Sequence, residues 1–416
     1  MKQSVTNKAN LSRKKKRLFI FIMCAGTLLI CLSVSEIAVR IISPQSDLRR
    51  RDLFFQYEPF IGFEGIPNKK GAFATRSFKT IVTLNNEGFR DYNHDKINTQ
   101  NKFRIVTLGD SFTWGHGVNN DQIFMKVLEK INPNIETINM GGSGGDPPTS
   151  LKGYMTRGIN YEHNVVLLGF YIGNDIVAYY PKDDDSPPQW GFDSEDKFAL
   201  IGKVKSPEEV DRIRRESEER YSPTKKRNFK KRITYWIVRH FQLYTFIDNS
   251  RDYCSNVLKG SVLYTRILKY FGIENKGAYG FLDYCREKDP EDVEYGWKLL
   301  TETLKTMKDY ARQMSAKLYV VFIPHDVQTS QELYERTARK YGYNTLEFDL
   351  EKPNRKLAAL CDKLGIGSLD LLPSMKEETS KGNRFYFKRD GHWNADGHRF
   401  AAKEIYKDMK ERGWIK

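Results

Sequence analysis

Two short polar clusters in this chain contain the residue types of a serine nucleophile and its base. Gly109-Asp110-Ser111 follows the apolar run 103–108, and a hydroxyl on the turn that ends a buried strand is a common way to hold a nucleophile at a sheet edge. Asp390 and His392 stand two positions apart near the C-terminus. A serine needs a base to accept its proton, and the imidazole needs a carboxylate that fixes its tautomer. The pattern predicts Ser111 as nucleophile, His392 as base and Asp390 as the orienting carboxylate.

Such chemistry also needs hydrogen-bond donors for the oxyanion, because each donor is worth roughly 10²–10³-fold in rate. Asn174 follows another apolar run and offers a side-chain amide, and Ser111 offers its own N–H. Gly144 belongs to a glycine cluster and offers an N–H that no side chain obstructs, although Gly142 and Gly145 are close enough to take its place. We therefore expect an oxyanion hole of Gly144, Asn174 and the Ser111 amide, with no metal and no cofactor.

The triplet Asp-Gly-His occurs twice, at 390–392 and at 396–398. Asn394 is a good helix N-cap, so we expect a helix to begin directly after it. His398 would then lie along that helix as a structural residue. The first triplet remains as the catalytic one.

The elements that must position these residues alternate between strand and helix from residue 103 onward. Strands are expected at 103–108, 135–140, 164–171, 317–323 and 368–371, and helices at 122–130, 148–158, 292–315, 330–341, 352–364 and 395–412. Strands separated by helices indicate an α/β fold with a central parallel sheet covered on both faces. Ligands of such folds bind beyond the carboxyl ends of the strands, where the polar clusters are expected.

The N-terminal region predicts a membrane anchor. An uncharged apolar stretch at 18–35, extended to residue 42, follows a basic run at 13–17. About 18–20 such residues cross the hydrocarbon core as a helix. The basic run predicts a cytoplasmic tail (1–17), a single-pass transmembrane helix (18–42) and an exported, periplasmic remainder. A cleaved signal peptide is the alternative, with a weak small-residue site at Ser33-Val34-Ser35.

Composition excludes some classes of protein. The net charge of +15 does not indicate a nucleic-acid partner, because much of the excess lies in three short runs and no zinc-finger spacing or RNA-binding motif accompanies them. With 39% hydrophobic residues, the chain is not disordered throughout. Three cysteines outside the apolar stretch, Cys254, Cys285 and Cys361, have no metal-site spacing. They are compatible with a Cys254–Cys285 disulfide or with three free thiols.

Two segments lie outside the alternating pattern. Residues 43–102 are turn-rich and aromatic, and we expect them to pack on the main domain, with an edge strand at 80–84 and Arg90 fixing a loop through an ion pair. Residues 180–290 interrupt the catalytic domain, which comprises 103–179 and 291–416. Their charged helix at 207–220 and their basic and aromatic runs favour a helical insertion, acting as a lid, as a surface for membrane or anionic glycan, or as helices packed on the core.

The order of the motifs resembles the SGNH (GDSL-type) hydrolase family. Its four blocks are similar, in order, to Gly109-Asp110-Ser111, residues 139–144, Gly173-Asn174-Asp175 and Asp390-Gly-His-Trp-Asn394. The resemblance covers residues 103–178 and 317–412, and it implies a three-layer, flavodoxin-like fold with the catalytic and oxyanion residues named above. Most of the family has two residues between Asp and His. The single residue here is similar to the D-x-H-W branch that includes periplasmic polysaccharide O-acetyltransferases.

These features predict an exported, membrane-anchored serine esterase that acts on acyl esters, with acetyl expected, of envelope carbohydrate or lipid. Two alternatives stay open. A polysaccharide O-acetyltransferase would use the same acyl-enzyme with a sugar hydroxyl in place of water, and a membrane protein could deliver its acetyl groups. A non-catalytic scaffold would bind glycan or lipid through the basic insertion.

The duplicated triplet generates a direct test. His392→Ala is expected to lower ester hydrolysis by roughly 10³-fold or more, because it removes the group that accepts the serine proton. His398→Ala is expected to leave the rate of the chemical step unchanged in those molecules that fold. Release of a chromogenic leaving group measures both variants, and full activity of His392→Ala would show that the base is another residue.

Overall fold

The computed structural model describes residues 13–42, 54–75, 77–142, 144–176, 186–221, 241–244, 246–247, 280–341, 344–388 and 390–416. The chain divides into two compact units, one of Met1–Asp47 with Pro223–Ser255 and one of Leu48–Ser222 with Asn256–Lys416. The first unit contains α1 (Arg13–Ile42), a helix long and apolar enough to cross a membrane. Within that unit, the Glu36 carboxylate accepts hydrogen bonds from the backbone N–H groups of Gln242 and Leu243 at 2.9 and 2.7 Å.

A five-stranded parallel sheet forms the centre of the second unit. Its strands are β5 (Phe103–Gly109), β6 (Ile135–Asn139), β7 (Val165–Tyr171), β10 (Lys317–Ile323) and β11 (Gly367–Asp370). They lie in the order β11-β10-β7-β5-β6, and every neighbouring pair is parallel. If the five strands are numbered in chain order and read across the sheet from β6, their order is 2-1-3-4-5, as in flavodoxin-like folds. The predicted fold class is therefore confirmed. The order reverses between β5 and β7, which is where such sheets bind ligands.

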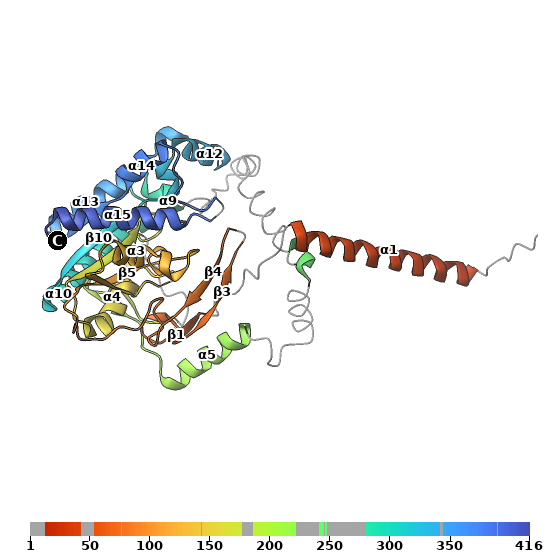
Figure 1. Ribbon diagram of the computed structural model, residues 1–416, viewed down its shortest axis with the longest axis horizontal. Helices are drawn as coiled ribbons and strands as arrows, with labels where there is room; N and C mark the ends of the chain where they lie inside the picture. The colour runs from red at the N-terminus through yellow and green to blue at the C-terminus, as the bar shows by residue number, and fades with distance from the viewer. Residues whose placement is uncertain are drawn as a thin grey trace, which may run out of the picture. The chain divides into compact units, whose positions relative to one another are not determined.

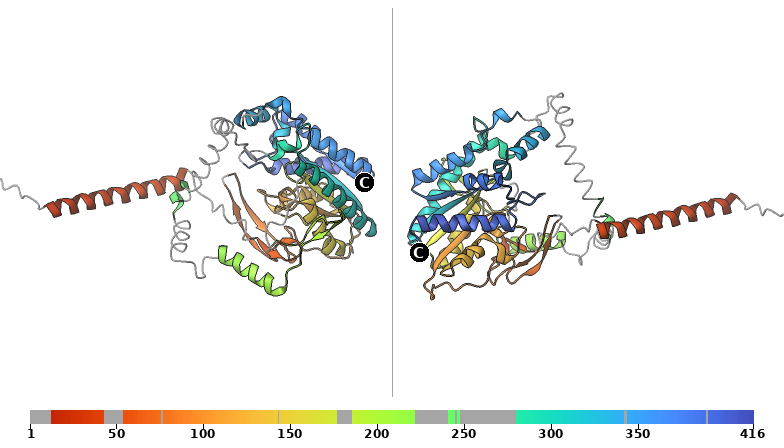
Figure 2. Two further views of the ribbon diagram at one scale, coloured as in Figure 1. Left: turned by 180° about the vertical axis from the view of Figure 1, so that it is seen from behind. Right: turned by 45° about the horizontal axis from the view of Figure 1, so that its top comes forward.

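Helices cover both faces of the sheet and produce three layers (Figures 1 and 2). One face carries α3 (Phe124–Ile131) and α15 (Ala395–Glu411), and the other carries α4 (Pro147–Thr156), α10 (Glu291–Gln313) and α13 (Lys352–Leu364). Along β7, Val165 and Leu167 face the helices α3 and α15, whereas Val166 and Leu168 face the helices on the other side of the sheet. Because both faces are buried, the strand consists of a continuous apolar run.

The predicted elements agree well with the observed ones. The bounds of β10 and α13 coincide with the predicted ranges, and the charged helix expected at 207–220 is α5 (Pro207–Tyr221). The helices α11 (Asp326–Thr329), α12 (Gln331–Tyr341) and α14 (Leu372–Ser380) complete the second half of the chain, and α11 and α14 were not predicted.

Two antiparallel hairpins precede the sheet. They pair β1 (Phe55–Glu58) with β2 (Gly62–Gly65), and β3 (Lys70–Ala74) with β4 (Lys79–Thr83). The strand predicted at 80–84 is β4, and its partner is β3. Phe73 and Val82 of this hairpin pack against Trp114, and the Thr80 hydroxyl donates to the Val118 carbonyl at 2.7 Å. The segment before the sheet therefore supports the loop that follows β5.

The described part of 180–290 contains a hairpin as well as helices. β8 (Gln189–Phe192) pairs with β9 (Phe198–Ile201), and α9 (Gly280–Tyr284) comes later in the chain. The hairpin was not predicted. The basic run at 225–232 and most of the aromatic run at 233–246 lie outside the described residues, so the role of the insertion and the domain boundaries stay predictions.

The cysteines of the second unit are thiols where the structure describes them. Cys285 and Cys361 are both buried and free, and Cys254 lies outside the described residues. The free thiol of Cys285 favours the alternative of free thiols over a Cys254–Cys285 disulfide.

Two glycines that pair at the end of β5 generate a test of stability. Gly109 has a φ of +141°, and a Cβ there would lie 2.6 Å from the Gly169 carbonyl oxygen. A Cβ at either position would lie within 2.5 Å of the Thr113 hydroxyl, but at Gly169 the nearest backbone atom is 3.7 Å away. Strain in this backbone region costs roughly 1–3 kcal/mol, so Gly109→Ala is expected to lower the melting temperature by several degrees more than Gly169→Ala. Thermal unfolding of the full chain in detergent measures both, and equal losses would contradict this reading of the glycine pair.

Candidate active site

Ser111 is the first residue of the short helix α2 (Ser111–Trp114), directly after β5. Asp110 caps this helix, because its Oδ1 accepts a hydrogen bond from the N–H of Phe112 at 2.9 Å. Gly115 ends the helix with a φ of 86°, a conformation that glycine adopts without strain. The sequence at this turn thus presents a partly buried hydroxyl at the carboxyl edge of the sheet.

The buried guanidinium of Arg90 fixes the loop that follows α2. It donates to the backbone carbonyls of Trp114, Gly115 and Val118, and its Nε donates to Asn120 Oδ1 at 3.0 Å. The predicted role in fixing a loop is correct, but the predicted ion pair is wrong, since these partners are neutral oxygens. Burial lowers the pKa of Arg90 to about 9. The converging carbonyl oxygens supply the acceptors that a buried cation requires.

Asp390 and His392 lie on a tight loop just before α15. Tyr386 and Trp393 form an antiparallel bridge across the base of this loop. Asn394 caps α15 as predicted, with its Oδ1 accepting from two backbone N–H groups of the first turn. The bridge and the cap fix both ends of the loop that carries the two side chains.

Ser111, His392 and Asp390 are connected by hydrogen bonds. Ser111 Oγ lies 2.8 Å from His392 Nε2, and His392 Nδ1 lies 2.5 Å from Asp390 Oδ1. Burial alone would raise the pKa of Asp390, but hydrogen bonds and charge attraction from His116 and His392 lower it below its ordinary value. An ionised carboxylate only accepts hydrogen bonds, so His392 Nδ1 carries the proton and Nε2 is free to accept from Ser111. This is the tautomer that a base for Ser111 requires.

His398, from the second Asp-Gly-His triplet, lies in the core between α3 and α15. It is only 1% exposed, and its Nδ1 accepts from the N–H of Phe124 at 3.3 Å. Burial lowers its pKa to about 3. A ring held neutral and used for packing fits the structural role expected for it, and the geometry favours His392 as the base.

The predicted oxyanion donors lie on the turns after β6 and β7, at the same sheet edge. Gly142 N–H donates to the Gly109 carbonyl at 2.9 Å, and Gly145 N–H donates to the Gly142 carbonyl at 3.1 Å. Among the described residues, none accepts a hydrogen bond from Gly144 N–H, so the backbone favours Gly144 over its two neighbours. Asn174 is exposed on its turn. The roles of Gly144 and Asn174 stay predictions.

Two buried carboxylates belong to the turns that follow β5 and β7. Burial raises the pKa of Asp110, although the Phe112 N–H and attraction to His392 oppose the shift. Burial also raises the pKa of Asp175, and repulsion by Asp110 adds to that shift. Asp175 Oδ2 accepts from the N–H of Tyr171 at 2.8 Å. The two carboxylates therefore hold the turns by capping backbone N–H groups, at an electrostatic cost.

Sequence reasoning missed one residue of the site. His116 Nε2 lies 3.4 Å from Asp390 Oδ2, and the His116 ring stacks on that of His392 with 4.0 Å between centroids. His116 stands five positions after Ser111, in a loop without helical or strand periodicity. No motif marks a lone histidine there, so only the folded loop shows its position.

His116, Asp390 and His392 also form a group that could hold a metal ion. Within the part of the chain that the structure describes, it is the only such group, with ligand atoms within 4.8 Å of one another. Imidazole nitrogens and carboxylate oxygens are ligands of zinc and related metals. Both nitrogens of His392 already have hydrogen-bond partners, so a metal ion would displace Ser111 or Asp390 from one of them. The arrangement therefore fits proton transfer better than metal binding.

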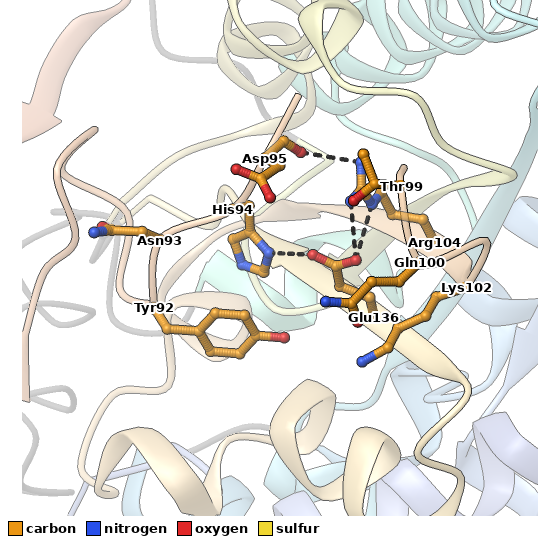
Figure 3. Close-up of a pocket in the computed structure, with 9 residues that line it drawn as sticks. All are labelled: Tyr92, Asn93, His94, Asp95, Thr99, Gln100, Lys102, Arg104 and Glu136. Atoms are coloured by element: carbon orange, nitrogen blue, oxygen red, sulfur yellow. Dashed lines mark hydrogen bonds and ion pairs between the residues drawn. The ribbon is translucent and has the colours of Figure 1, made fainter. Parts of the chain in front are cut away.

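A small cavity of about 130 Å³ lies near the amino ends of the strands, away from Ser111 (Figure 3). Arg104 and Glu136, which line it, stand near the N-terminal ends of β5 and β6. Glu136 accepts a hydrogen bond from Arg104 at 3.0 Å, and its other oxygen lies 2.6 Å from His94 Nδ1. These charges neutralise one another far along the strands from Ser111, so the network serves to hold the strand beginnings together.

Comparison with known proteins finds a family model that matches part of the chain and several similar solved structures. Residues 291–416, which contain Asp390 and His392, match the family model described as SGNH hydrolase-like domain, acetyltransferase AlgX. Similar solved structures include a member of the lipolytic protein G-D-S-L family from Veillonella parvula, with 10% identity, coverage of 74% of this chain and 98% of that chain, and a TM-score of 0.34. Others are the acetyl xylan esterase AlAXEase (10% identity, 73% and 98% coverage, TM-score 0.37) and the lipase/acylhydrolase from Enterococcus faecalis (12%, 74% and 96%, 0.35). No curated protein matches the chain.

The buried Asp110 generates a prediction about pH. Its pKa is higher in the folded chain than its unfolded value near 4, so the folded state binds more protons and loses stability as the pH rises above about 4. Asp110→Asn keeps an oxygen to cap α2 but cannot ionise. The melting temperature of this variant is therefore expected to rise relative to wild type between about pH 4 and pH 8.

The matched control for this measurement is Asp193→Asn, which changes an exposed carboxylate. A difference between Asp110→Asn and wild type that stays constant over the pH range would contradict the prediction.

Proposed function

Because the chain carries an SGNH hydrolase-like domain, we propose that it is a serine enzyme that cleaves acyl esters through an acyl-enzyme on Ser111. The observation that carries the proposal is the continuous hydrogen-bond chain from Ser111 Oγ through His392 to Asp390, with distances of 2.8 and 2.5 Å. A serine becomes a competent nucleophile when a correctly oriented base accepts its proton.

The reaction has two halves that use the same base. Ser111 Oγ attacks the ester carbonyl carbon while its proton passes to His392 Nε2, and the leaving alkoxide then takes that proton as the carbon–oxygen bond breaks. A water molecule gives its proton to His392 Nε2 as it attacks the acyl-serine, and Ser111 Oγ leaves with that proton. Asp390 keeps His392 Nδ1 protonated and stabilises the imidazolium in both halves.

The oxyanion of each half needs fixed donors at its own position. We assign this role to the N–H groups of Ser111 and Gly144 and to the side-chain amide of Asn174. Support for Gly144 comes from its neighbours, Gly142 and Gly145, whose N–H groups are used within the backbone. Loss of one such donor typically lowers the rate roughly 10²–10³-fold.

The proposed substrates are acyl esters, with acetyl expected, on envelope carbohydrate or lipid. The apolar helix α1 supports an envelope substrate. A single-pass anchor with its basic end in the cytoplasm would keep the catalytic domain on the outer face of the membrane that it spans. The alternative of a cleaved signal would release the same domain into the same compartment.

A second candidate function is transfer of the acyl group to a sugar hydroxyl. Two observations favour it: the matching family model is described by an acetyltransferase, and a single residue separates Asp390 from His392. The acyl-enzyme is common to both reactions, and only the second nucleophile differs. A transferase would also need an acetyl donor, which a membrane partner could supply.

Ester turnover by the purified full chain in detergent tests the acyl-enzyme. With a chromogenic acetyl ester, Ser111→Ala is expected to lose activity by roughly 10³-fold or more, because the attacking oxygen is absent. Ser380→Ala, at an exposed serine on α14, is the matched control and is expected to keep full activity. Equal turnover by Ser111→Ala and wild type would exclude Ser111 as the nucleophile. Absence of turnover by both proteins would instead favour the non-catalytic binding scaffold.

Adding an oligosaccharide acceptor to the same reaction separates hydrolysis from transfer. Free acetate as the main product supports the proposed hydrolase. Acetylated oligosaccharide as the main product would replace it by the transferase.

A further inference from the structure

Asp390 has two histidine partners rather than one. Its Oδ1 faces His392 Nδ1 at 2.5 Å, and its Oδ2 faces His116 Nε2 at 3.4 Å. Because the ionised carboxylate only accepts, His116 Nε2 must carry a proton and donate it. The contact is long for a hydrogen bond, as such contacts often are before substrate binds.

His116 is held by the nucleophile loop itself. Its backbone N–H donates to the Ser111 carbonyl at 3.0 Å, and the preceding Gly115 carbonyl is bound by Arg90. Phe73 and Phe78 of the β3–β4 hairpin contact the His116 ring edge to face, with centroids 5.1 and 5.0 Å away. The side chain is only 13% exposed. His116 is therefore a rigid extension of the Ser111 loop that reaches the Asp390 loop.

Two polar contacts thus join the two loops, and only one of them persists when Ser111 is acylated. One is Ser111 Oγ to His392 Nε2, and it requires the serine O–H. Once Ser111 is acylated, that O–H no longer exists, and His392 Nε2 loses its partner. The contact of His116 with Asp390 does not involve the reacting oxygen, so acylation leaves it intact.

We propose that His116 is a positioning residue that keeps Asp390, and through it His392, in place during the acyl-enzyme stage. This inference rests on the proposed function. During deacylation, His392 must accept a proton from water while no bond to Ser111 orients its ring. The hydrogen bond from His116 holds the Asp390 carboxylate, and the carboxylate in turn holds His392 Nδ1.

Two substitutions separate the hydrogen bond from packing. His116→Phe keeps a flat ring against His392 but cannot donate to Asp390. His116→Gln keeps an N–H of similar reach but loses the ring. If the hydrogen bond positions Asp390, His116→Phe lowers the rate of deacylation, and His116→Gln restores most of it.

The first experiment measures the two half-reactions of the full chain with a chromogenic acetyl ester. Burst kinetics give the acylation rate, and the decay of acetylated Ser111, followed by intact mass, gives the deacylation rate. In His116→Phe we expect deacylation and kcat to fall roughly 10–100-fold, the range for losing a hydrogen bond to a charged group. We expect kcat/KM, which reports acylation, to fall less than about threefold, and His116→Gln to stay within about threefold of wild type in both.

Three outcomes would overturn the proposal. They are unchanged deacylation in His116→Phe, an equal fall of kcat and kcat/KM in that variant, and a loss in His116→Gln as large as in His116→Phe. The last two would indicate general disturbance of the site or simple packing.

A second experiment does not depend on turnover, so it separates this proposal from the proposed function. Ser111→Ala removes the serine partner of His392, as acylation does. In histidine-labelled full-length protein, the downfield proton signal of His392 Nδ1–H is expected to persist in Ser111→Ala and to be lost to water exchange in Ser111→Ala with His116→Phe. Persistence in the double variant would refute the role of His116 even if no ester is ever found to be a substrate.

Discussion

An ionised carboxylate accepts hydrogen bonds and donates none, and this property of Asp390 determines the protons around it. The imidazole nitrogens of His392 and His116 that face its two oxygens must both carry hydrogen. His392 Nε2 is then left as the basic atom toward Ser111. The carboxylate, hydroxyl and imidazole come from loops far apart in sequence, so the whole arrangement depends on the precision with which the fold brings two loops together.

That precision comes from backbone contacts on each loop. On the nucleophile side, Asp110 caps α2, and Arg90 gathers the carbonyls that follow it. On the other side, the bridge between Tyr386 and Trp393 and the Asn394 cap fix the loop that carries Asp390. The cost is the burial of charged groups, which raises the pKa of Asp110 and lowers that of Arg90.

The central strands were predictable because they are buried on both faces and therefore consist mostly of apolar residues, such as 318–323 of β10. The hairpins β1–β2, β3–β4 and β8–β9 were harder to predict, since their strands are short, most of them contain glycine or a charged residue, and each strand pairs only with its hairpin partner. Recognisable motifs marked the candidate site residues in the sequence. Ser111 and Asn174 follow strands, and the Asp390–His392 pair precedes a helix. The partners of Arg90 are backbone carbonyls, and His116 acts through a fold-dependent approach of two loops; neither has a signature in the sequence.

The glycine pair formed by the last residue of β5 and Gly169 of β7 affects how the chain finds its correct strand alignment. Gly109 lies opposite Gly169, and neither position has room for a Cβ as the backbone stands. A shift of one residue would bring Leu168 or Phe170 opposite Gly109 and would also exchange the two faces of β7. Because neither glycine has a side chain, this pair favours the correct alignment of the two strands. Gly109 stands two positions before Ser111, so a misaligned strand would displace the nucleophile.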